Sequence, residues 1–359
     1  MKTCFVGDFC PTEITNPLFA SGAVDVLFED TLSLFAGNDV NMINVECALT
    51  EADTPIRKIG PNLKATPKAA EVLAKVGFTH ATISNNHTYD FGPNGFTDTV
   101  ENLMAAGITP TGYGKNAQDA RKNLIIEKDG EKLAIVAVCE HEYTYALENR
   151  MGCRPFDEFE TVEDVRDAKA QADRVVVLYH GGKEHCQYPS PRLRRLCRAL
   201  VRAGADMVLC QHSHCIGCYE NYQNGHILYG QGNFHFVKPH VLTTWHDSLV
   251  VTYDTKTNDF GVVPIHNTEQ GIARSEGARK DEILEAFARR NASLQDGSWE
   301  KGWQAFCEGN REAYTNAIGN AGRPESSAGA NHVFAHYLDC EAHTDVWRTL
   351  FKTSHYDNE

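Results

Sequence analysis

The stretch VLCQHSHCIGC, residues 208–218, is an apolar run that ends abruptly in two histidines and two cysteines. Short apolar runs of this kind are typical of buried strands. A histidine pair and a C-x-x-C pair each arise by chance, so the stretch alone leaves three interpretations open: metal ligands, a redox pair, or polar residues that merely follow a strand. The other apolar runs of the chain have to decide among them.

Several other apolar runs also end in residues that can bind a metal or act in catalysis. These residues are Asp8 after CFVG, Glu46 after MINV, Asn85, Asn86 and His87 after ATIS, and His180 after VVVLY, beside His212 and His214 after MVLC. In open α/β sheets, sites form beyond the carboxyl ends of the strands. We therefore expect these side chains, distant in sequence, to gather at one edge of a sheet.

The apolar runs alternate with helical patterns such as residues 66–77 and 190–204, both of which end in Gly. Repeated strand–helix units predict an α/β fold with a largely parallel sheet. From about residue 275 the pattern is helical, with no convincing strand. We expect an α/β domain over residues 1–270 and a helical C-terminal extension over residues 271–359. The extension could pack on the core, cover the site or dimerise.

Composition and charge narrow the class of protein. The 359 residues carry a formal charge of −14, which argues against nonspecific binding to nucleic acid or to anionic membranes. The N-terminus lacks the pattern of a signal peptide, and no run approaches the ~20 apolar residues of a membrane span. Most of the 12 cysteines lie in apolar surroundings, as expected of buried thiols in a reducing compartment. A cytoplasmic location is expected.

The polar set combines carboxylates, amides and imidazoles. Such oxygen and nitrogen donors suit Mn, Fe or Zn rather than copper or an iron–sulfur cluster. A carboxylate shared by two cations can stabilise both the attacking and the leaving oxygen of a hydrolysis. The sequence therefore favours a site for divalent metal ions, with two ions expected.

Six blocks of sequence carry a resemblance to a known family. They are GDF, NVECALT, NNHTYDFG, HGGKEHCQYPSP, GADMVLCQHSHCIGCYE and LYGQGNFHF. Together, over roughly residues 3–268, they resemble the CapA-type capsule, or poly-γ-glutamate, synthesis proteins of the calcineurin-like metallophosphoesterase superfamily. The resemblance implies a double β-sandwich flanked by helices, in α/β/β/α layers, with two metal ions at one edge.

The resemblance also implies a role for each matching residue. Asp8 and His214 resemble ligands of the first metal ion, and Glu46 resembles the acid that bridges both ions. Asn86, His180 and His212 resemble ligands of the second ion. His87 resembles the histidine that assists at the leaving oxygen, and Asp90 could orient it. Further candidates for the site are Asn85, Lys183, Glu184 and Asn233.

Two departures from the superfamily pattern concern the first metal site. The superfamily often begins D-x-H, whereas this chain has Asp8, Phe9 and Cys10, so a Cys10 thiolate would have to replace the histidine. Gln211 stands where the family usually has Gly before its H-x-H. The pair Cys215 and Cys218 has no counterpart in the family and no second C-x-x-C in the chain, so we interpret it as a local variation.

These observations predict a metal-dependent, phosphoesterase-like hydrolase that acts on a small or polymeric anionic substrate. Two alternatives stay open. The protein could be a non-catalytic accessory that binds an anionic polymer such as poly-γ-glutamate, because fold does not establish chemistry. It could instead cleave an amide or γ-glutamyl bond with its metal ions. A homo-oligomer formed through the C-terminal helices is a further expectation.

Overall fold

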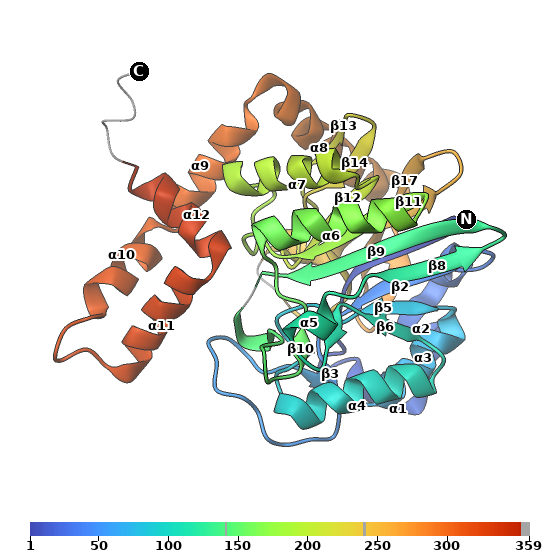
Figure 1. Cartoon of the computed structure of the whole chain (residues 1–359), viewed down its shortest axis with the longest axis horizontal. Coiled ribbons are helices and arrows are strands. Elements are labelled where there is room, and N and C mark those ends of the chain that lie inside the picture. Colours follow the sequence, from blue (N-terminus) through green and yellow to red (C-terminus); the bar gives the residue numbers. More distant parts are fainter. Residues whose placement is uncertain (141, 240–241, 353–359) are drawn as a thin grey trace.

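The computed structural model describes residues 1–140, 142–239 and 242–352. Two β-sheets pack face to face, and helices cover the outer face of each sheet (Figure 1). The predicted α/β/β/α order of layers is confirmed.

The first sheet has a parallel centre and an antiparallel edge. Its order is β18 (Ile272–Arg274), β17 (Asp259–Asn267), β16 (Asp247–Asp254), β1 (Lys2–Phe9), β2 (Val40–Val45), β5 (His80–Thr82) and β6 (Thr109–Thr111). A further strand, β15 (Asn233–His235), pairs in parallel with the end of β1. From β1 to β6 all pairs are parallel, so the carboxyl ends of these strands share one edge.

The second sheet also has a parallel centre, but antiparallel strands lie at both of its edges. Its order is β13 (Tyr219–Tyr222), β14 (Gly225–Leu228), β12 (Met207–Gln211), β11 (Arg174–His180), β9 (Glu131–Cys139) and β8 (Leu124–Lys128). Two short ladders lie outside the sheets: β3 (Ala48–Leu49) with β4 (Lys64–Ala65), and β7 (Tyr113–Gly114) with β10 (Gly152–Cys153).

Alternating side chains of the strands divide the core into layers. Phe5 of β1 and Met42 of β2 pack between the sheets against Ile135 and Leu178 of the second sheet. Their neighbours face outward against helices. The first sheet is covered by α1 (Asn16–Ser21), α2 (Val24–Phe28), α3 (Lys68–Val76) and α4 (Gly92–Ala105). The second sheet is covered by α6 (Glu158–Gln171) and α7 (Pro191–Ala203).

Short elements complete the α/β part of the chain. They are α5 (Ala117–Ala120) and the 3-10 helices Glu29–Leu34, Glu142–Thr144 and Thr243–His246. The strongly amphipathic α7 begins where the Ser190 hydroxyl accepts the backbone N–H of Leu193 at 3.0 Å, and it ends at Gly204. Both ends follow the residue types that cap helices.

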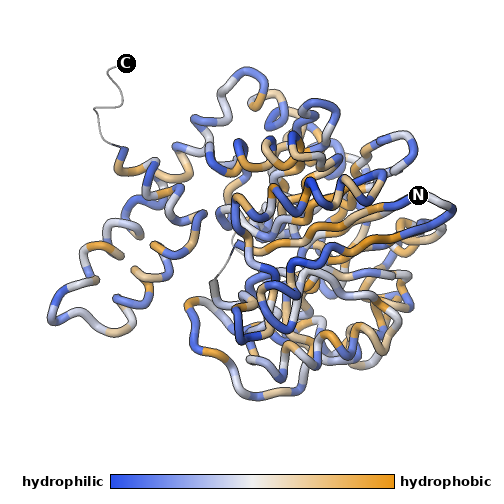
Figure 2. The backbone as a smooth tube through the Cα atoms, viewed as in Figure 1, coloured by the Kyte–Doolittle hydropathy of each residue, from blue (hydrophilic) through white to orange (hydrophobic). Residues whose placement is uncertain are grey.

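Up to residue 352, where the described part of the chain ends, the C-terminal part consists of five helices. They are α8 (Gly277–Asp296), α9 (Trp299–Gly309), α10 (Arg311–Asn320), α11 (Ala328–Asp339) and α12 (Glu341–Leu350). Ile283 and Phe287 of α8 close the core between the sheets, whereas α9–α12 form a cluster beside it (Figure 1). Figure 2 shows continuous apolar strands in the sheets and mixed hydropathy along these helices.

The division predicted at residue 270 falls just before β18, which belongs to the first sheet, and the division itself stays a prediction. All twelve cysteines are buried. Over the described ranges, the helices are too short or too polar to cross a bilayer.

Candidate metal centre

Strand pairing brings the predicted ligands to one edge. Asp8 near the end of β1 lies opposite Asn44 of β2 on one side and Asn233 of β15 on the other. In the second sheet, His180 at the end of β11 pairs with Gln211, so His212 follows directly beside it. Both sheets therefore direct polar residues to their carboxyl ends, as the sequence predicts.

Three groups of side chains in the described part of the chain have ligand atoms that all lie within 4.8 Å of one another. The groups are Asp8, Glu46 and His214; Glu46, His180 and His212; and Glu184, His212 and His214. Glu46 belongs to the first two groups, which is the arrangement that a carboxylate shared by two cations requires.

Glu46 provides the clearest fit to a cation. Its side chain is completely buried, and neither carboxylate oxygen has a hydrogen-bond partner among the described residues. The nearest ring nitrogens are the Nε2 atoms of His180 and His214, at 3.3 and 3.9 Å from Oε1. Burial of a carboxylate without hydrogen bonds is costly, and a coordinated metal ion would compensate that cost.

Asp8 is held firmly in the same centre. The Asn44 amide donates to its Oδ1 at 2.7 Å, and the backbone N–H of His212 donates to its Oδ2 at 3.0 Å. Burial acts to raise the pKa of Asp8, but the hydrogen bond and charge of His214 hold that pKa below its usual value. An ionised, oriented carboxylate is the form that binds a cation.

His214 lies between Asp8, Glu46 and Asn233. Its Nδ1 is 3.3 Å from Asp8 Oδ2 and 2.8 Å from Asn233 Oδ1. Burial acts to lower the pKa of His214, but the charges of Glu46 and Asp8 raise it to about 9. The excess negative charge that attracts this proton would equally attract a metal ion.

His180 and Asn86 meet on the other side of Glu46. The Nε2 atom of His180 is 2.7 Å from Asn86 Oδ1, and its Nδ1 is 3.1 Å from the Asn44 amide nitrogen. Asn44 thus contacts one residue of each Glu46-containing group, Asp8 and His180. Partners of this kind orient metal ligands.

His87 lies beside the ligand groups, and two charged side chains contact its Nδ1 atom. Its Nδ1 is 2.6 Å from Asp90 Oδ2 and 3.1 Å from Lys58 Nζ, and Lys58 also pairs with Asp90 at 2.6 Å. Burial and the charge of Lys58 lower the pKa of His87 against the opposing effect of Asp90. The other ring nitrogen, Nε2, is therefore the atom available to a substrate.

Two of the predicted ligand histidines have an uncommon backbone conformation. His212 has φ 84° and His214 has φ 54°, in the left-handed region that non-glycine residues rarely adopt. Such conformations persist where the surrounding structure imposes them, and they concentrate at functional sites.

The remaining predicted residues have different surroundings. Asn85 is buried, and its Oδ1 accepts the backbone N–H groups of His87 and Thr88, so it shapes the loop. Cys10 is buried in the apolar core, where the contact with Cys47 and burial raise its thiol pKa well above the usual value. It belongs to none of the three groups, whereas Glu184 belongs to one of them.

The two cysteines of the opening stretch, Cys215 and Cys218, are buried thiols, and burial raises the pKa of each to about 12. Neither belongs to the groups of possible metal ligands in the described ranges. This environment agrees with their interpretation as a local variation.

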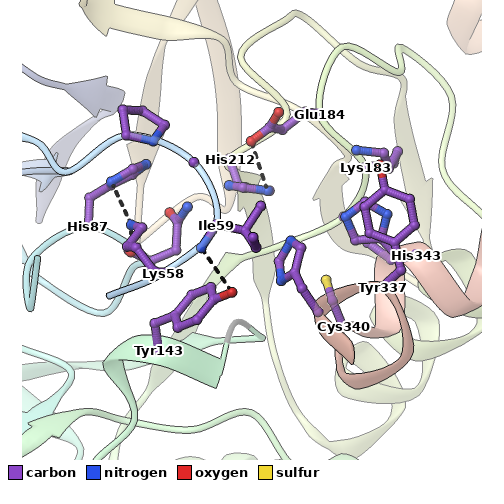
Figure 3. A pocket seen from close by; sticks show the side chains of 16 residues that line it. Lys58, Ile59, His87, Tyr143, Lys183, Glu184, His212, Tyr337, Cys340 and His343 are labelled. Atoms are coloured by element: carbon purple, nitrogen blue, oxygen red, sulfur yellow. Dashed lines mark hydrogen bonds and ion pairs between the residues drawn. The ribbon is translucent and has the colours of Figure 1, made fainter. Parts of the chain in front are cut away.

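A cavity of about 260 Å³ opens beside the ligand groups. His87, Asn86, Lys183, Glu184 and His212 line it from the α/β core (Figure 3). Residues of α11, of α12 and of the link between them line its other side: His336, Tyr337, Cys340, Ala342 and His343. No pattern in the sequence indicates this second wall.

Two residues of the core also escaped the sequence reasoning. Asn44 lies inside an apolar strand, and only its position two residues before Glu46 could have indicated a role in the site. Lys58 stands in the polar segment PIRKIGPN, residues 55–62, which reads as ordinary loop.

The fold and this edge define a mixed α/β protein with clustered carboxylates and histidines able to hold metal ions. Residues 2–238 match the model of the family described as bacterial capsule synthesis protein PGA_cap. The chain belongs to that family.

The relatives that are similar in sequence include two CapA proteins from Bacillus. "PGA biosynthesis protein CapA" of Bacillus subtilis (strain 168) is 27% identical over 303 residues, covering 80% of this chain and 78% of the relative. "Capsule biosynthesis protein CapA" of Bacillus anthracis is 29% identical over 219 residues, covering 58% of this chain but only 53% of the relative. The chain thus spans about half the length of the second relative.

Solved structures give weaker likenesses. A hypothetical protein from Thermus thermophilus covers 77% of this chain and 100% of its own, with 13% identity and a TM-score of 0.48. A 5'-nucleotidase precursor from the same organism covers 80% of this chain and 58% of its own, with 14% identity and a TM-score of 0.44. At these TM-scores neither match bears on the function.

Proposed function

We propose that the protein is a metal-dependent hydrolase of phosphoesters. The observation that carries the proposal is the buried carboxylate of Glu46, which lacks hydrogen-bond partners among the described residues and is shared by two groups of possible ligands. Asp8 and His214 would hold one cation with Glu46, and His180, His212 and Asn86 would hold another. These residues supply the oxygen and nitrogen donors that Mn, Fe and Zn accept.

When bound, such cations supply a water of lowered pKa and neutralise charge on the phosphoryl oxygens. Hydrolysis consumes one water: its oxygen bonds to phosphorus, the ester P–O bond breaks, and the leaving oxygen takes up a proton. His87, held at Nδ1 by Asp90 and Lys58, presents Nε2 to that leaving oxygen. Lys183 lines the same cavity and adds positive charge for an anionic substrate.

The test combines metal content with turnover. Wild-type protein should retain a transition metal through gel filtration and hydrolyse an aryl phosphate. Glu46→Gln, which keeps the shape but removes the charge, should lose most of the metal and lower kcat/KM by roughly 10³-fold.

Glu220→Gln is the matched control, since Glu220 is a partly buried carboxylate that binds Arg194 and Arg198 instead. It should leave metal content and turnover unchanged. Equal turnover in wild type and Glu46→Gln would overturn the proposal.

An accessory role is the second candidate. A Mycobacterium tuberculosis relative, 29% identical over 209 residues, is described as a "Probable polyglutamine synthesis accessory protein". Metal retention together with binding of poly-γ-glutamate, but without release of phosphate or amine from any ester or amide tested, would favour this role. Release of amine from γ-glutamyl peptides without phosphate release would favour an amide hydrolase.

A further inference from the structure

The cavity beside the ligand groups has two walls that come from distant parts of the chain. One wall is the carboxyl edge of the sheets, with His87 and His212. The other is formed by Tyr337 near the end of α11 and His343 in α12. Figure 3 shows Tyr337, Cys340 and His343 on the opposite side of the cavity from His87.

Buried charges fix this second wall to the core. Asp345 of α12 accepts the Ser190 hydroxyl at 2.5 Å and the Arg192 Nε at 3.0 Å. Arg192 reaches on to Glu140, which follows β9, at 3.1 Å. The side chains of Asp345 and Glu140 are 4% and 0% exposed, so solvent screens these ion pairs little.

Close apolar packing fixes the wall a second time. Trp303, Cys307 and Tyr314 form a cluster with Val346 of α12 and with Cys186 of the core. Gly302 allows this approach, because a Cβ there would lie 2.4 Å from the ring of Tyr188. The wall is therefore a built part of the site and has two independent attachments.

Aromatic rings dominate the surface of this wall. Tyr337 stacks on His343 with ring centroids 4.1 Å apart and planes at 14°, and Tyr143 of the core stacks on His336 at 5.6 Å and 25°. Burial and the nearby charge of Lys183 lower the pKa of His343 to about 2, so this ring is neutral. A largely aromatic surface thus faces a strongly polar one.

Building on the proposed function, we propose that the helical wall selects the substrate: the cavity binds small phosphomonoesters whose leaving group carries a planar ring. The phosphate would lie at the ligand groups, and the ring would pack against Tyr337. Rings in aromatic pockets gain offset or edge-to-face contacts that alkyl groups lack. The cavity, about 260 Å³, is small beside the usual ~300–1,000 Å³ of ligand pockets, which suits a small ligand.

Tyr337→Ala and Tyr337→Phe test the proposal. KM and kcat are measured for phenyl phosphate and for glycerol 2-phosphate, which lacks a ring. Tyr337→Ala should raise KM for phenyl phosphate roughly 10-fold and leave KM for glycerol phosphate and both kcat values within about 2-fold. Tyr337→Phe, which keeps the ring, should behave as wild type. Leu338→Ala, at the neighbouring residue, which is 51% exposed, controls for loosening of α11.

A binding measurement separates this proposal from the proposed function. Calorimetry on manganese-loaded protein compares phenylphosphonate with methylphosphonate, neither of which is hydrolysed. If wild type prefers the phenyl compound and Tyr337→Ala abolishes that preference, the result supports substrate selection by the helical wall, even if no ester is turned over. Equal affinity of wild type for both phosphonates overturns it, even if phosphoesters are hydrolysed.

Discussion

The carboxyl edge of the sheets and the C-terminal helices form the two sides of one cavity, but different forces position them. At the edge, backbone ladders set the places of the ligands: Asp8 lies opposite Asn44, and His180 lies opposite Gln211. The helical wall depends on side chains, chiefly the buried contacts of Asp345. A single substitution at Asp345 should therefore loosen the wall while leaving the edge intact.

Among the variants that separate the two sides of the cavity, Asp345→Ala should have the largest effect, which is on the stability of the helical wall. It removes the carboxylate between Ser190 and Arg192 and leaves the buried guanidinium with part of its charge unpaired. Loss of one partner from a buried pair costs about 3 kcal/mol of stability. The α9–α12 cluster should unfold at lower temperature and become sensitive to protease, while metal content stays at the wild-type value.

The control for this variant is Arg348→Ala. Arg348 lies 3.7 Å from the same carboxylate, but its side chain is 72% exposed. Such exposed pairs contribute little, so the change in stability should stay under about 0.5 kcal/mol. If Asp345→Ala lost the metal together with the helices, the two sides of the cavity would be one cooperative unit and the distinction would fail.

Asn44→Ala addresses the edge itself. Asn44 donates to Asp8, lies 3.1 Å from His180 Nδ1 and accepts from the Asn85 amide at 3.0 Å. Loss of a residue that orients ligands lowers metal affinity typically by about 10–100-fold. Titration of the metal-free protein with Mn²⁺ or Zn²⁺ measures this loss.

Asn41→Ala is the matched control within the same strand. Asn41 is also a buried asparagine of β2, but it donates to the carbonyls of Phe35 and Gly77 at the opposite end. Its removal should lower stability and leave metal affinity unchanged. If Asn44→Ala bound metal with wild-type affinity, the strand ladders alone would be enough to position the ligands, and the proposed role of Asn44 would be wrong.

The difference between the strand ladders of the edge and the side-chain contacts of the helical wall also explains what the sequence could predict. Apolar runs followed by polar residues indicate both a strand and the end of that strand, so an α/β fold and the gathering of Asp8, Glu46, His180, His212 and His214 follow from the pattern. The order of the layers was instead implied by the resemblance to a known family. The layers are confirmed. Metal binding by these residues stays a prediction, supported by the buried Glu46 carboxylate, whose oxygens lack hydrogen-bond partners among the described residues.

What escaped the sequence reasoning lacks such a periodic signal. The packing of α12 depends on Asp345 meeting Arg192, which is 153 residues earlier in the chain and lies in an ordinary amphipathic helix. Tyr337 and His343 read as residues of a helical pattern, and nothing in their spacing indicates a cavity. Lys58 reads as a solvated loop residue, although its side chain is 2% exposed against Asp90.

Substitutions of Cys10 and Glu184 should have the smallest effects on metal affinity. They are also the sharpest test of which residue completes the first metal site. Cys10 occupies the position of a superfamily histidine, but its raised pKa keeps it a thiol, which is a poor ligand. Glu184 shares a group with His212 and His214. Glu184→Gln should weaken metal binding about 10-fold, the lower end of what the residues that support a ligand shell contribute.

Cys10→Ala is the counterpart of that variant at the other candidate position. It should leave metal affinity unchanged and cost about 1 kcal/mol of stability through the small cavity it opens. Elemental analysis and calorimetric titration of both variants decide between the two residues. If Cys10→Ala lost metal while Glu184→Gln kept it, the Cys10 thiolate would be the ligand. The position that Cys10 shares with the superfamily histidine would then predict the ligand better than the raised pKa of its thiol does.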